Sequence, residues 1–138
     1  MQKQYNNPES LPDWSSMFTQ VVVVEHYALR FLHISGQVGV DRDKQLTGNG
    51  NFQEQTRQSF ANLQIALASG GASIHDVVKL VIYVVNYQYD HASIIRKELL
   101  NVFPKDRLPA LSLIGVATLA EERFLIEVDA EAITQVDK

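Results

Sequence analysis

Three carboxylates alternate with apolar residues near the C-terminal end of the chain. In the segment FLIEVDAEAI, Glu127, Asp129 and Glu131 are each separated by one apolar residue. In an extended strand this spacing places all three carboxylates on one face. The simplest interpretation is a strand with one solvated face. The alternative is that one carboxylate lies in a cleft, has a raised pKa and positions a water molecule there.

Other kinds of catalytic or metal site find little support in the sequence. There is no cysteine, which excludes disulfides, thiol nucleophiles and thiolate metal ligands. There is also no GxSxG turn, no phosphate-binding loop and no dinucleotide fingerprint. The histidines lack the HxH and HExxH spacings of metal ligands. They are His26, His33, His75 and His91. We therefore expect no metal and no cofactor.

Three further polar residues are candidates for a site or for its support. Arg107 precedes the apolar strand of RLPALSLIGVATL, where it is either a ligand-binding cation or a solvated loop residue. We expect Tyr83, in the central strand, to pack in the core or in an interface, with stacking against a ligand as the alternative. Asn62 lies in the middle of a predicted helix, where asparagine is unfavourable. We therefore expect its amide to hold a neighbouring loop.

The hydrophobic pattern predicts the elements that must position these residues. Apolar residues at spacings of three and four predict a helix from residue 52 to Gly70-Gly71, and a second from residue 89 or 91 to 102. Apolar, β-branched runs predict strands over 18–25, 28–35, 76–86, 110–116 and 124–132. The order is β-β-α-β-α-β-β, which predicts one α+β domain over residues 17–138. We expect residues 1–16, which are polar and contain two prolines, to form an extended N-terminal arm.

Several strands are apolar at both odd and even positions. The runs VVVV, VVKLVIYVV and LSLIGV would bury both of their faces, whereas two helices can cover only one face of such a sheet. Large uncovered apolar faces are usually interfaces. The pattern therefore predicts an oligomer, and a monomer with a modest exposed patch is the alternative.

Composition bounds the class of protein. A chain of 138 residues with 46% apolar residues can build one core. A net charge of −4, with no run of lysines or arginines, disfavours nucleic acid as a partner. The N-terminal segment lacks the apolar core of a signal peptide, and no apolar stretch is long enough to span a bilayer. We therefore expect a cytoplasmic protein without membrane contact.

Six segments together resemble the Rid family, also called YjgF, RidA-like or endoribonuclease L-PSP. They are FTQVV, SGQ, EQTRQSFANL, GASIHDVVKLVIYV, LPALSLIGVATL and IEVDAEAI, in the family's order and spacing over residues 17–133. The resemblance implies a chorismate-mutase-like fold, with the sheet covered by helices on one face. It also implies a homotrimer with clefts between subunits for a small-molecule ligand. The best-known activity of the family is hydrolysis of 2-enamines and 2-imines to 2-ketoacids and ammonia.

The resemblance also exposes a departure from the family pattern. Deaminating members carry an arginine directly after the Pro-Ala of this strand, and its guanidinium holds the substrate carboxylate. Here Leu111 follows Pro109-Ala110. Arg107 lies four residues upstream, roughly 13 Å away along an extended chain. It is therefore a weak candidate for a replacement.

The remaining family pocket positions match unevenly. Phe18 stands where deaminating members have a tyrosine, whereas Ser35 and Gly36 match. The backbone of Leu113 can still donate a hydrogen bond, and Glu127 matches the glutamate that holds the attacking water.

Four hypotheses follow. The first is a trimer without the usual deaminase activity, either a divergent hydrolase or a ligand-binding protein. The second is an active 2-iminobutanoate/2-iminopropanoate-type deaminase that uses another cation. The third is a ribonuclease or translation inhibitor, which the acidic charge disfavours. The fourth is a structural or chaperone-like trimer whose clefts have no ligand.

Overall fold

The strands and helices follow the hydrophobic pattern of the sequence in a computed structural model, which describes residues 1–136. The elements are β1 (Gln2–Asn6), β2 (Val21–His26), β3 (Leu29–Val38), α1 (Phe52–Ser69), the 3₁₀ turn η1 (Ile74–Asp76), β4 (Val77–Val85), α2 (Tyr89–Val102), β5 (Ala110–Val116) and β6 (Ile126–Gln135). The predicted α+β class is confirmed. Both helices and the five predicted strands are present, with shifts of a few residues at their ends.

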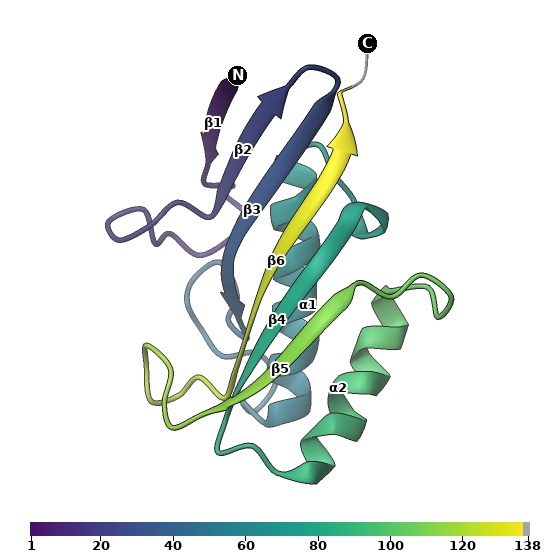
Figure 1. The fold of residues 1–138 in the computed structure, drawn as a ribbon. Coiled ribbons are helices and arrows are strands. Elements are labelled where there is room, and N and C mark those ends of the chain that lie inside the picture. The colour runs from purple at the N-terminus through teal and green to yellow at the C-terminus, as the bar shows by residue number, and fades with distance from the viewer. Residues whose placement is uncertain (137–138) are drawn as a thin grey trace.

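The six strands form one mixed sheet in the order β1-β2-β3-β6-β4-β5. Only β4 and β5 are parallel neighbours, because α2 connects them as a crossover. The other neighbouring pairs are antiparallel. The C-terminal strand β6 is thus inserted between β3 and β4, and Figure 1 shows it in yellow at the centre of the sheet.

The helices pack against one face of the sheet. Asn51 caps α1 by accepting a hydrogen bond from the Glu54 amide at 2.8 Å, and Gly70 lies at the other end. The face of α1 that carries Phe60, Leu63 and Leu67 is fully buried on the sheet. In Figure 1, α1 runs behind β6 and β4. Neither helix of residues 1–136 is long and apolar enough to cross a membrane.

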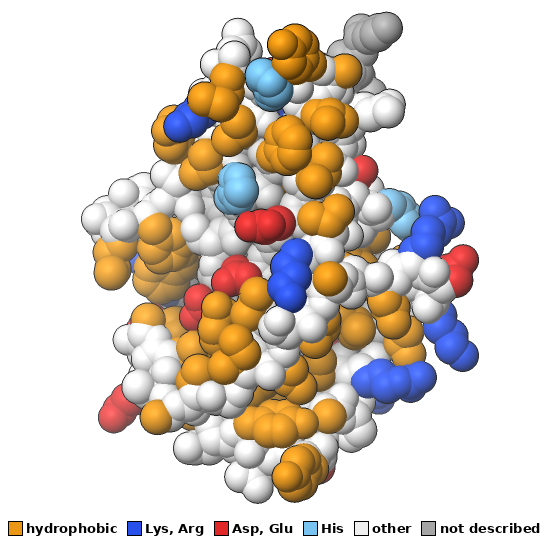
Figure 2. Space-filling view, in the orientation of Figure 1, with side chains coloured by type: hydrophobic (Ala, Val, Ile, Leu, Met, Phe, Trp, Pro, Cys, Tyr) orange, Lys and Arg blue, Asp and Glu red, His pale blue; other side chains and the backbone are white. Residues whose placement is uncertain are grey.

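Among residues 1–136, no helix covers the opposite face of the sheet. Alternation puts Leu80 and Ile82 of β4 in the core, and leaves Lys79, Val81 and Tyr83 on the open face. Figure 2 shows this face, with apolar side chains towards both ends and acidic groups, a histidine and a basic side chain between them. Large apolar side chains remain partly exposed there, including Ile114 and Ile133.

The N-terminal segment, expected as an extended arm over residues 1–16, includes a strand of the sheet. Gln2–Asn6 forms the edge strand β1, which pairs with β2 from Gln2↔Glu25 to Asn6↔Val21. Leu11 is 3% exposed and belongs to the core. The segment QKQYN shows no alternation of apolar and polar residues, because β1 is joined to β2 by backbone pairing and buries no side-chain face.

The strand expected over residues 28–35 continues past Gly36 to Val38. The SGQ sequence does not end the strand. Instead, the register of β3 against β6 shifts between Ile34 and Gln37, which is a β-bulge. This irregularity lies beside Glu127 and shapes the candidate site.

Candidate functional site

Glu127 is held on the open face of the sheet by the strands on either side of it. It is opposite Val38 of β3 and Tyr83 of β4, while its neighbours Ile126 and Val128 are fully buried in the core. Gly36, at the bulge, lies directly against its carboxylate, so that a Cβ at residue 36 would overlap Glu127 Oε1. A side chain at residue 36 would therefore displace the carboxylate.

The segment before β2 supplies an aromatic wall. The carbonyl of Trp14 accepts hydrogen bonds from the amides of Met17 and Phe18, which folds the segment into a turn. The rings of Trp14 and Phe18 then stack with centroids 6.5 Å apart. Two hydrogen bonds attach this segment to β3. Ser35 Oγ donates to the Thr19 carbonyl at 2.6 Å, and the Ser35 amide donates to the Gln20 carbonyl at 2.9 Å.

A third wall comes from the loop between β5 and β6. Gln55 of α1, fully buried, holds this loop through its side-chain amide. It donates to the carbonyls of Arg123 at 2.9 Å and Gly50 at 3.0 Å, and accepts from the Leu125 amide at 2.9 Å. These bonds fix the backbone on both sides of Phe124.

Asn62 supports the same region in the predicted way. Its amide donates to the carbonyls of Val38 at 2.9 Å and Val40 at 2.8 Å, just beyond the bulge. The residue is 2% exposed. The expectation that Asn62 holds a neighbouring loop is thus confirmed.

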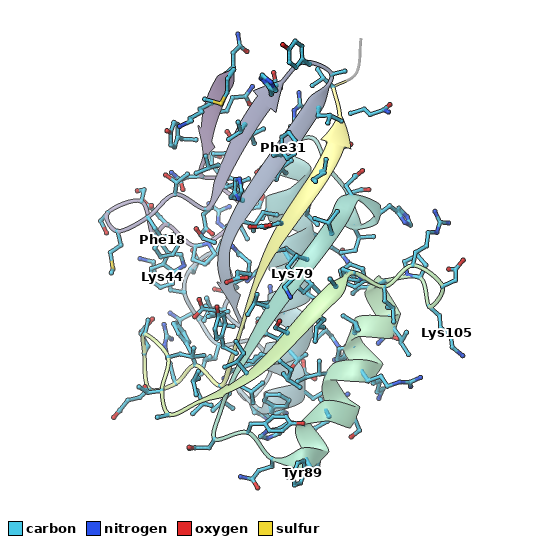
Figure 3. All side chains as sticks on the ribbon, viewed as in Figure 1. Phe18, Phe31, Lys44, Lys79, Tyr89 and Lys105 are labelled. Carbon is cyan, nitrogen blue, oxygen red and sulfur yellow. The ribbon has the colours of Figure 1, made fainter. Side chains whose placement is uncertain are left out.

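Together these walls enclose a hollow of about 340 Å³, which is large enough for a small organic ligand. It is lined by Trp14, Met17, Phe18, Gly36, Val38, Ala120, Glu121, Phe124 and Glu127. Three predicted site residues, Phe18, Gly36 and Glu127, are therefore brought together. Figure 3 shows Phe18 at the side of the sheet, next to β3.

Carboxylates and a phenol share the sheet face next to the hollow. Burial, and then the charge of Asp129, raise the pKa of Glu127. Burial also raises the pKa of Asp129, against the opposing effect of its interaction with the Tyr83 hydroxyl. The charge of Asp129 in turn raises the pKa of Tyr83, which keeps the phenol protonated. A carboxylate with a raised pKa is a stronger proton acceptor, and it can also hold a water molecule by accepting a hydrogen bond.

Leu111 and Leu113 do not join this hollow within one chain. They pair in register with Leu80 and Ile82, both of which face the helices. Side chains alternate between the two faces along β4, so Tyr83 points away from the side on which Leu80 and Ile82 are buried. Glu127 pairs with Tyr83 and therefore projects from that same open face. β5 is an edge strand, and Leu111 is 40% exposed there.

The other predicted residues take different positions. Ser35 lines a separate depression with His33 and Glu131, and its hydroxyl is used to hold the Phe18 segment. Tyr83 lies on the open sheet face opposite Glu127. Arg107 is exposed in the turn before β5, and its amide donates to the Pro104 carbonyl at 3.0 Å.

Some site residues were not apparent from the sequence. Trp14 lies in the segment that we expected to be an arm, and Phe124 appeared only as the first residue of a strand. Gln55 is buried in a helix whose pattern gives it no special status. The only signal was that Trp14 is the single tryptophan of the chain. Within residues 1–136, no cluster of three or more histidines and carboxylates is arranged to hold a metal ion.

The fold and site define a class of protein. It is an α+β domain with helices on one sheet face and a ligand-sized hollow containing a carboxylate beside the other. The chain belongs to the Rid/YjgF family, since the family model described as Endoribonuclease L-PSP matches residues 9–134.

The chain is similar to several known proteins. One is a RutC family protein of Pyrococcus abyssi, 27% identical over 96% of this chain and 98% of the relative. Another is a 2-iminobutanoate/2-iminopropanoate deaminase of Dermatophagoides farinae, 27% identical over 77% of this chain and 78% of the relative. A solved structure from Thermotoga maritima has a TM-score of 0.82 and 27% identity, over 95% of this chain and 97% of that one.

Proposed function

We propose that this chain is a Rid-family homotrimer that binds a small molecule in clefts between subunits, without the family's usual deamination of 2-enamines and 2-imines. The observation that carries this proposal is Leu111, which stands where the deaminating members have the carboxylate-binding arginine. The hollow around Glu127 forms one side of each proposed cleft.

The arrangement of the sheet supports the assembly. Leu111 and Leu113 lie on the sheet face opposite to Glu127 and do not line the hollow of their own chain, but β5 is an edge strand. The open face also presents partly exposed apolar residues such as Ile114 and Ile133. Packing three such faces together would bury this apolar surface. It would place the β5 edge of one subunit beside the hollow of the next.

The charges of the site support the loss of deaminase activity. An α-imino acid carries a carboxylate, which in this cleft would meet Leu111 from one subunit and Glu127 from the other. A buried anion without a cationic partner loses several kcal/mol of binding free energy. Glu127 can still orient water, so hydrolysis of a substrate without a carboxylate remains within the chemistry of the site.

An active deaminase that uses another cation is the second candidate. The similarity to a relative named as a 2-iminobutanoate/2-iminopropanoate deaminase favours it. Arg107 is the candidate cation, because it lies in the turn that leads into β5.

An assay with imines generated in situ by an amino-acid oxidase separates the two candidate functions. The measured quantity is the rate of ketoacid release. We expect wild-type protein to match the rate without enzyme, and Leu111→Arg to release ketoacid faster. Leu108→Arg, which adds the same charge to the preceding turn, is the matched control and should have no effect. Wild-type acceleration that Arg107→Ala abolishes would establish the second candidate.

A further inference from the structure

The hollow has the chemistry of a site for an organic cation. Its lining includes the aromatic residues Trp14, Phe18 and Phe124, and its charged residues are Glu121 and Glu127. The faces of aromatic rings attract cations through their quadrupole. Among the described residues that line the hollow, none is lysine, arginine or histidine.

Of the two carboxylates that line the hollow, Glu127 is the one without an ion pair among residues 1–136. Glu121 pairs with Arg123 at 3.3 Å, and Glu131 lies 3.6 Å from His33. In residues 1–136, Glu127 makes no ion pair, and its nearest charged neighbour on β6 is the like-charged Asp129. A partly buried carboxylate next to a like charge is destabilised, and a bound cation would relieve this.

The aromatic wall already attracts a positive charge. The ammonium nitrogen of Lys44 lies 4.4 Å from the ring centroid of Trp14, which is within cation–π range. Figure 3 shows Lys44 next to Phe18, whose ring stacks on Trp14. Arg123 lies 5.3 Å from the ring centroid of Phe124, so two of the three rings make cation–π contacts with residues outside the lining.

We propose that the hollow binds a small protonated amine, with its apolar body against Trp14, Phe18 and Phe124 and its ammonium group at Glu127. This inference rests on the proposed function, because it assigns a ligand class to the same cleft. Leu111 in place of the family's arginine agrees with binding of an amine. A fixed guanidinium in the cleft would repel a protonated amine.

Three ligands of similar size and different charge test the proposal. They are cyclohexylmethylammonium, cyclohexanecarboxamide and cyclohexanecarboxylate. Trp14 is the only tryptophan, so its fluorescence reports binding in the hollow, and these ligands do not absorb at its excitation wavelength. In the intact protein we expect the ammonium to bind at least about tenfold more tightly than the carboxylate, with the carboxamide between them.

The isosteric variant Glu127→Gln should weaken ammonium binding on the order of tenfold and leave carboxamide binding within about twofold. Glu131→Gln, which removes the same charge four residues along the strand and outside the hollow, is the matched control and should change neither. An ammonium preference that persists in Glu127→Gln would overturn the assignment to Glu127.

The two proposals fail in different ways. If the carboxamide binds wild-type protein as tightly as the ammonium, the cation inference is overturned and the proposed function stands. If none of the three binds, or if the carboxylate binds most tightly, the proposed function is overturned as well.

Discussion

At the scale of single residues, Gly36 makes room for the Glu127 carboxylate. The two residues come from different strands and meet because the bulge in β3 brings residue 36 against β6. Ser35, next to it, uses its hydroxyl to hold the segment that carries Phe18. Adjacent residues of one strand thus position two different walls of the same hollow.

Replacing Gly36 with alanine should displace the Glu127 side chain and leave the fold intact, because the overlapping group is the mobile end of that side chain. We expect affinity for cyclohexylmethylammonium to fall on the order of tenfold. Titration of Trp14 fluorescence measures this. In the double variant with Glu127→Gln, the two losses should not add, since both act on one carboxylate. Additive losses would contradict the account.

The raised pKa of Glu127 should make the stability of the protein depend on pH. A carboxyl group that binds its proton more tightly in the folded state destabilises the fold once it ionises. The thermal midpoint of wild type, relative to Glu127→Gln, should therefore fall by ~1–3 °C as pH rises from the ordinary glutamate pKa through the raised one. Thermal unfolding of both proteins between pH 4 and 8 tests this. A difference that is constant with pH would refute it.

At the scale of elements, α1 is both part of the core and the support of the site. Its apolar face packs on the sheet, while Gln55 and Asn62 of the same helix hold the loop before β6 and the chain after β3. A second contact joins α1 to α2, because the Glu98 carboxylate of α2 is 2% exposed and accepts hydrogen bonds from Arg57 and Gln53.

Replacing Gln55 with alanine should loosen the loop that carries Phe124. Two carbonyls and one amide would lose their partner, at a cost of about 1–3 kcal/mol in the free energy of unfolding. Urea unfolding measures this cost. Gln64→Ala, on the exposed side of the same helix, is the control and should stay within about 0.5 kcal/mol of wild type. An equal effect of the two variants would contradict the role given to Gln55.

Glu98 should contribute stability that acid removes. Burial alone would raise its pKa, but the hydrogen bonds from Arg57 and Gln53 and the charge of Arg57 lower it overall. A lowered folded-state pKa gives stability that is present above the ordinary glutamate pKa and is lost as pH falls through the folded-state value. Glu98→Gln should therefore lose stability at pH 7 and flatten the acid limb of the unfolding curve between about pH 5 and 2. An acid limb identical to that of wild type would rule this out.

The sequence predicted elements better than it predicted the site. Helices and central strands bury regular faces, so their apolar spacing identifies α1, α2 and β4 almost to the residue. β1 left no such pattern, because backbone pairing alone holds it to β2. The hollow was only partly predictable, since Trp14 and Phe124 come from distant loops. Their approach depends on hydrogen bonds from Ser35 and Gln55 that no local pattern encodes.

At the scale of the whole molecule, the sheet has one face in a core and one face open. The open face combines apolar ends with the carboxylates of β6 in its middle, as Figure 2 shows. β5 lies at the edge of this sheet and carries Leu111, on which the proposed loss of deamination depends. The proposed trimer accounts for the open face and the exposed edge together.

We therefore expect the protein in solution to have a mass of about 46.5 kDa, three times the 15.5 kDa of one chain. Ile114→Lys would place a charge in the proposed interface and should shift the population towards monomers in sedimentation velocity. Tyr89→Lys, at the start of α2 away from this face, is the control and should leave the mass unchanged. A monomeric wild-type protein would contradict the assembly.

A crystal structure soaked with cyclohexylmethylammonium and, separately, with cyclohexanecarboxylate tests the central claim most directly. The account predicts that cyclohexylmethylammonium binds in the cleft, in contact with Phe18 and Glu127 of one subunit and Leu111 of the next. It predicts that cyclohexanecarboxylate does not bind there. A carboxylate bound there by Arg107, or by another cation of a neighbouring subunit, would contradict the claim that the cleft has lost its carboxylate clamp.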